Sequence, residues 1–172
     1  MKKNILLYGV ISGAIIISSI ILSLVTANAD TSMAALEWLG YLVMLLALSV
    51  IFVAIKRYRD QELGGVIKFG TAFLMGLGIS LVASLIYVLA WEAHLAITDY
   101  AFIDTYTAGV ISAKEAAGVT GVELEQAMAE MDQLKTRYSN PVFRLFITFS
   151  EIFPVGLLVS CLLYTSPNPR DS

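Results

Sequence analysis

The chain has 172 residues, of which 58% are apolar and 15% are charged, and its formal net charge is −3. A soluble domain carries about 25% charged residues, and a mean hydropathy of +0.77 points the same way, towards a membrane protein. The apolar residues form long blocks, which are typical of membrane spans. Because the basic residues lie beside these blocks, we expect no nucleic-acid partner. A single cysteine, Cys161, excludes an internal disulfide and a cysteine-based metal cluster.

The first apolar block covers residues 4–26 and follows Lys2 and Lys3. Ala27-Asn28-Ala29 after it imitates the cleavage site of a secretory signal peptide. The apolar region of a signal peptide is usually ~7–15 residues long, and this block is longer. We therefore expect the block to be retained as a first span, with the N-terminus in the cytoplasm.

The next two apolar blocks, residues 36–56 and 68–92, predict a membrane hairpin with Trp38 and Trp91 at the ends where interfacial aromatic residues are common. The connector KRYRDQELGGVIK carries the basic residues that set the topology, which are Lys56, Arg57, Arg59 and Lys68. Short connectors rich in Lys and Arg stay in the cytoplasm.

Small residues recur every four positions in the third span, at Ala72, Gly76, Ser80 and Ser84. Such a stripe allows another helix to approach closely. A substrate path lined by Ser80 and Ser84 is the alternative, but serines in a span commonly bond to carbonyls of their own helix. We favour packing.

Residues 98–139 are mixed in polarity and predict an extracytoplasmic helical hairpin between spans three and four. Its first half, residues 99–117, continues the apolar spacing of the third span and is expected to extend that span outward. Thr120 and Glu123 form a capping-box pattern, which places the start of the second helix near Gly121. The hairpin is too short for an independent core, so it should lean on the spans or on a partner.

The fourth span, residues 142–163, contains Glu151 and Pro154 inside an apolar run. An ionisable residue within a span is a functional candidate. The alternative is a protonated or hydrogen-bonded carboxyl, with Ser49, Ser80 or Tyr87 as the donor, that only locks the bundle.

Glu92 and His94, with Glu37, could be read as a metal site, but the chain has one histidine, and zinc needs three or four close ligands. A solvated interfacial cluster is the better interpretation. The sequence lacks the short motifs of common enzymes, so we predict no catalytic residue, no cofactor and no metal.

The last residues, 161–172, read CLLYTSPNPRDS and resemble a translated sequencing adapter. We expect this tail to be non-native, with the natural fourth span continuing past Ser160; a genuine short tail is the alternative.

Three stretches carry a family resemblance, and their most specific pieces are IKRYRD, GGVIKFGTAF and EIFPVGLLVS. Over residues 1–160 the chain resembles the bacterial membrane proteins catalogued as domain of unknown function 4199 (DUF4199). The resemblance implies four spans with both termini in the cytoplasm, and it implies no activity.

We therefore expect an all-α integral membrane four-helix bundle, with residues 1–160 as one domain of the bacterial inner membrane. Its predicted function is non-enzymatic assembly, in the lipid bilayer, with itself or with a membrane protein partner through the small-residue stripe and the outer hairpin. The alternative is a small ion- or proton-linked carrier or channel subunit that uses Glu151.

Overall fold

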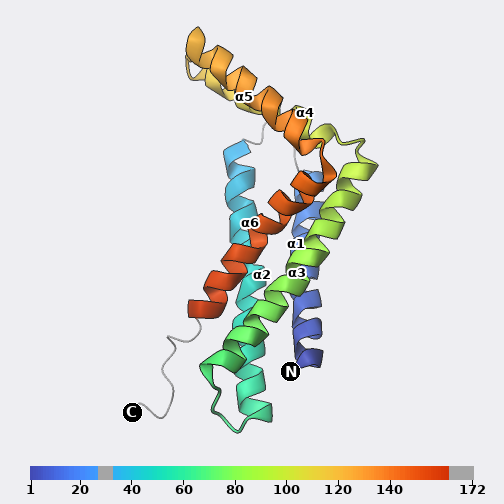
Figure 1. Ribbon diagram of the computed structural model, residues 1–172, viewed down its shortest axis with the longest axis vertical. Helices are drawn as coiled ribbons and strands as arrows, with labels where there is room; N and C mark the ends of the chain where they lie inside the picture. The colour runs from blue at the N-terminus through green and yellow to red at the C-terminus, as the bar shows by residue number, and fades with distance from the viewer. Residues whose placement is uncertain (27–32, 163–172) are drawn as a thin grey trace. The chain divides into compact units, whose positions relative to one another are not determined.

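The computed structural model describes residues 1–26 and 33–162, and all regular structure in this part of the chain is helical. Ala27-Asn28-Ala29 and most of the 161–172 tail lie outside it. The helices, labelled in chain order in Figure 1, are α1 (Lys2–Thr26), α2 (Met33–Glu62), α3 (Phe69–Ile97), α4 (Ala101–Ala116), α5 (Val122–Tyr138) and α6 (Pro141–Leu162).

Four of these helices are long and apolar enough to cross a membrane, over Lys2–Ile21, Gly40–Glu62, Phe69–Ile97 and Pro141–Cys161. At 1.5 Å per residue, about 20 apolar residues cover a hydrocarbon core of roughly 30 Å. A helix also satisfies its own backbone N–H and C=O groups, which lipid cannot do. The protein is therefore an all-α membrane protein.

Helix α2 continues beyond its apolar segment into the basic connector. It stays helical through Glu62, so Lys56, Arg57 and Arg59 lie on its last two turns. The turn to α3 is short and contains Gly64 and Gly65 with φ of 66° and 95°, a conformation in which a side chain would be strained.

By its contacts the chain divides into two compact units. The first contains Met1–Val88 and Phe149–Ser172, and the second contains Leu89–Thr148.

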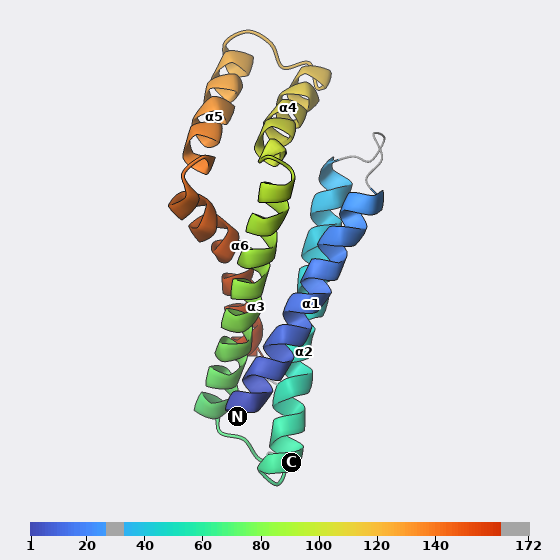
Figure 2. The same cartoon turned by 90° about the vertical axis from the view of Figure 1, so that its right-hand side faces the viewer.

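In the first unit, α1 packs beside α2 and α3 (Figure 2). The Ser12 hydroxyl, which is fully buried, donates to the Ala47 carbonyl of α2 at 2.9 Å. On the side of α3, Gly9 meets Val82 and Gly13 meets Ile86. A Cβ added to Gly9 would lie 2.6 Å from the Val82 Cβ, so the two backbones approach too closely for a larger residue.

The first turn of α1 is attached to the end of α2 through Glu62. The Asn4 side-chain amide donates to Oε1 of Glu62 at 2.9 Å, and the N-terminal amino group lies 3.8 Å from Oε2. The start of α1 and the end of α2 therefore lie at the same end of the unit.

In the second unit, α3 ends at Ile97 and does not extend outward. Asp99 and Tyr100 have φ of 50° and 58°, and two consecutive left-handed residues cannot continue a right-handed helix. Residues 101–116 form the separate helix α4, so the expected extension over 99–117 was wrong.

The predicted capping box is absent as well. Gly121 is the N-cap of α5, with φ of 64° and no side-chain hydrogen bond. The helix therefore begins one residue later than the pattern required, and Glu123 occupies the second helical position rather than the third. An ion pair of 2.8 Å between Lys135 Nζ and Asp104 Oδ1 links α5 to α4.

Candidate functional site

The small-residue stripe of α3 is buried within the first unit. Ala72, Gly76, Ser80 and Ser84 are all buried, and the two serines have no exposed surface. Their helix is therefore in contact with neighbouring helices of the same chain along this whole face.

Helix α6 approaches the stripe with a matching pair, Gly156 and Ser160. A Cβ added to Gly76 would lie 2.5 Å from the Ser160 Oγ, and a Cβ added to Gly156 would collide with Ser80. Each serine thus occupies the space left by the glycine of the other helix. Since Gly76 lies opposite Ser160 and Ser80 opposite Gly156, the two helices run antiparallel.

Two of the serines at this contact, Ser80 and Ser160, form hydrogen bonds inside their own helices. Ser80 donates to the Gly76 carbonyl at 2.9 Å, and Ser160 donates to the Gly156 carbonyl at 2.7 Å. The buried Ser84 hydroxyl has no hydrogen-bond partner among the described residues. Close contact is therefore the main physical effect of the stripe.

The α6 half of this contact was missed in the sequence analysis. Its signal was present as a repeated pentapeptide, GLGIS at residues 76–80 and GLLVS at residues 156–160. Both share Gly, Leu, a β-branched residue and Ser at the same positions, and the two copies are the segments that pack against each other.

Glu151 lies on α6 with its side chain exposed. The Tyr87 hydroxyl of α3 donates to its Oε2 at 3.0 Å. The other two hydroxyls considered, on Ser49 and Ser80, donate to carbonyls of their own helices. Within the described part of the chain no basic group forms an ion pair with Glu151.

One face of α6 remains uncovered around this acid. Glu151, Pro154, Leu158 and Cys161 are all exposed, and their spacing of three, four and three residues places them on one side of the helix. Helix α6 continues through Pro154, which has no N–H to donate to the Ser150 carbonyl. We call this surface the Glu151 face.

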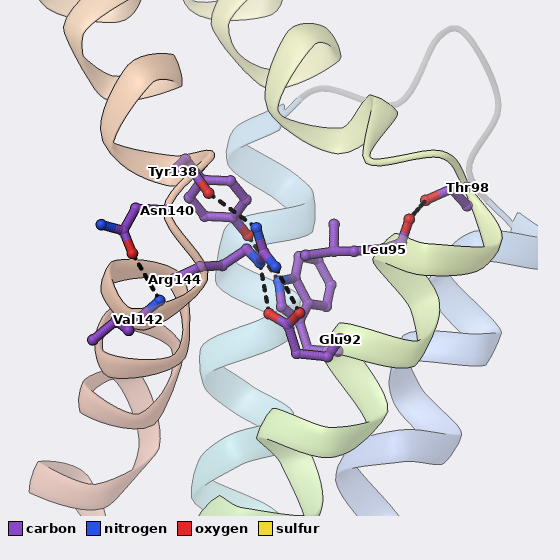
Figure 3. Close-up of polar contacts among 8 residues, drawn as sticks. Glu92, Leu95, Thr98, Tyr138, Asn140, Val142 and Arg144 are labelled. Atoms are coloured by element: carbon purple, nitrogen blue, oxygen red, sulfur yellow. Dashed lines mark hydrogen bonds and ion pairs between the residues drawn. The ribbon is translucent and has the colours of Figure 1, made fainter.

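The second unit contains a partly buried ion pair that was not predicted. Arg144 at the start of α6 donates to both carboxylate oxygens of Glu92 in α3, at 2.6 Å from Nε and 2.8 Å from Nη2 (Figure 3). Its Nη1 donates to the Tyr138 carbonyl at 3.1 Å, and the Tyr100 ring lies 4.8 Å from the guanidinium carbon. The Arg144 side chain is 7% exposed.

This ion pair bears on whether Glu92 and His94 belong to a metal site or to a solvated cluster. The carboxylate of Glu92 is engaged by Arg144, so the expectation of a solvated cluster was wrong for this residue. The His94 ring packs 5.3 Å from the Trp91 ring. No group of three potential metal ligands occurs among the described residues, and the side chain of Glu37 lies outside them.

The basic residues expected to set the topology surround one end of the first unit. Lys56, Arg57 and Lys68 are exposed, and Arg59 is half-buried. Arg59 pairs with Asp60 at 2.8 Å, and Arg57 Nε donates to Gln61 Oε1 at 3.1 Å.

Comparison with known proteins gives one match. The family model described as protein of unknown function (DUF4199) matches residues 7–163. A search of the curated proteins and a search of the solved structures each found no match. The matched range includes most of α1, all of α2, α3 and α6, and the Glu151 face, so the chain belongs to the DUF4199 family.

Proposed function

We propose that this protein is a non-enzymatic membrane bundle that assembles, through the Glu151 face, with a second copy of itself or with another membrane protein. The observation that carries the proposal is the exposed carboxyl of Glu151 in the middle of an apolar span. Ionisable groups in a membrane face a bundle interior or a water-filled cavity, because exposure to lipid is costly.

Tyr87 supplies one hydrogen bond to a group that has about four acceptor positions when ionised. A helix of a partner that brings further hydrogen-bond donors would occupy the remaining acceptor positions of Glu151 and shield the carboxyl from lipid. The α3 stripe is already occupied by Gly156 and Ser160 of the same chain. The exposed face of α6 is therefore the better supported surface for assembly.

The proposal places the protein in the bacterial cytoplasmic membrane with its N-terminus and the α2–α3 turn inside. Support comes from the contacts of Glu62, which hold the start of α1 beside the basic end of α2, and from the preference of basic segments for the cytoplasm. Because α3 would then cross outward and α6 inward, the α4–α5 hairpin between them would be extracytoplasmic.

Cysteine cross-linking in membranes tests the assembly directly. In a Cys161→Ser background, Leu158→Cys on the Glu151 face should give a disulfide-linked dimer. Leu7→Cys, which is on α1 and similarly exposed (52% against 61% for Leu158), is the matched control and should stay monomeric.

Two substitutions of Glu151 then separate the roles of its charge and its polarity. Glu151→Leu should weaken the dimer about 3- to 30-fold, since an interhelical hydrogen bond in a membrane contributes ~0.6–2 kcal/mol. Glu151→Gln keeps an acceptor and should be mild. Equal cross-linking at Leu158 and Leu7, or no effect of Glu151→Leu, would reject self-assembly, and co-purification of another membrane protein would identify the partner instead.

A second candidate, a small ion- or proton-linked carrier or channel subunit, is favoured by the contact of Glu151 with a tyrosine hydroxyl, which can relay a proton. This role predicts the opposite order of effects. Glu151→Gln would abolish proton- or ion-dependent uptake in vesicles while cross-linking at Leu158 remained absent.

A further inference from the structure

Six basic side chains gather at one end of the first unit, at the start of α1, on the last turns of α2 and at the start of α3. They are Lys2, Lys3, Lys56, Arg57, Arg59 and Lys68, and we call them the basic rim. Figures 1 and 2 both show these three helix ends at the same end of the unit. The contacts of Glu62 with Asn4 and the N-terminal amino group hold α1 and α2 together there.

The acids in this region leave most of the basic rim without a partner. Asp60 is engaged by Arg59, and Glu62 is engaged by the N-terminal residues. Lys2, Lys3, Lys56 and Lys68 are exposed, and their ammonium groups form no hydrogen bond or ion pair within the residues that the structure describes. Four ammonium groups are thus available to an anion.

The surface beside the rim is apolar. Phe69 follows Lys68 directly, is 46% exposed and stacks on Phe73 with ring centroids 5.7 Å apart. Leu7 and Val53, one to two turns from the rim on α1 and α2, are also exposed, at 52% and 53%. An amphiphile that places its charge on the lysines would therefore lay its chains on these helices.

We propose that the basic rim binds the phosphate headgroups of anionic phospholipids. Clusters of four to eight Lys and Arg residues next to a spanning helix attract anionic lipids, and each basic group near the surface contributes about 1 kcal/mol. Charge complementarity selects the headgroup, and continuity with the lipid-facing surface of α1, α2 and α3 selects a lipid over a soluble anion. The rim would fix the depth of the bundle at one leaflet.

Native mass spectrometry of the full chain in detergent tests this binding. The probes are phosphatidylglycerol and phosphatidylcholine with identical acyl chains, with inorganic phosphate as the competitor. The test variant is Lys56→Gln/Lys68→Gln, and the matched control is Lys114→Gln/Arg137→Gln, which removes two basic groups from the α4–α5 hairpin. Circular dichroism checks the helical content of both.

The wild type should retain phosphatidylglycerol at least tenfold more tightly than phosphatidylcholine. The rim variant should lose about 30-fold of that affinity, as two groups of ~1 kcal/mol imply, while the control keeps it. Equal binding of the two lipids by the wild type would overturn the proposal, as would an equal loss in the control pair. Displacement of the lipid by equimolar inorganic phosphate would overturn the choice of a lipid.

Discussion

At the residue scale, Arg144 donates three hydrogen bonds within the second unit. Its guanidinium holds Glu92 through two hydrogen bonds and the Tyr138 carbonyl through a third. The sequence could not predict this pair, because the two residues are 52 positions apart and nothing local links them. Glu92 was instead grouped with His94, its neighbour along the chain.

We expect Arg144→Met to lower the free energy of unfolding by about 1–3 kcal/mol, because it leaves the partly buried Glu92 carboxylate without its partner. The double variant Glu92→Leu/Arg144→Met should recover much of this loss, since an apolar pair removes the uncompensated charge. Thermal unfolding of each variant in detergent, followed by circular dichroism, measures both effects. Additive losses in the double variant would contradict a coupled pair.

At the scale of elements, α3 contacts both α1 and α6 in the first unit. One face receives α1, where Gly78 meets Ile5, and another receives α6, where Gly76 meets Ser160. The stripe on α3 could be read from its four-residue spacing. Its partner on α6 forms no such stripe: its signal is the pentapeptide GLLVS, which repeats the pattern of GLGIS in α3, and the repeat shows nothing about contact until the two segments are seen side by side.

Gly156→Leu should destabilise the bundle by at least about 1–3 kcal/mol, the usual cost of overpacking, because its new side chain would collide with Ser80. Gly40→Leu is the matched control, since nothing lies within 4 Å of a Cβ added there. Retention of the folded monomer during detergent-stability measurements compares the two. If both variants proved equally stable, the reciprocal Gly and Ser contact would not hold α3 against α6.

At the scale of the whole molecule, the fold class followed from hydropathy alone, because each apolar block is long enough to span a bilayer as a helix, which satisfies its own backbone there. The break between α3 and α4 could not be predicted from hydropathy. It depends on the positive φ of Asp99 and Tyr100, and the apolar spacing runs through both residues without a signal. Helix periodicity predicts faces better than it predicts ends.

The most direct test of the account is the accessibility of two engineered cysteines in a Cys161→Ser background. Leu63→Cys lies in the α2–α3 turn and Gln126→Cys lies on α5, and both positions are exposed. In intact bacterial cells a membrane-impermeant maleimide should label Gln126→Cys alone, and permeabilised cells should show labelling at both positions. Labelling of Leu63→Cys in intact cells would contradict the proposed topology, in which the basic end of the bundle lies in the cytoplasm.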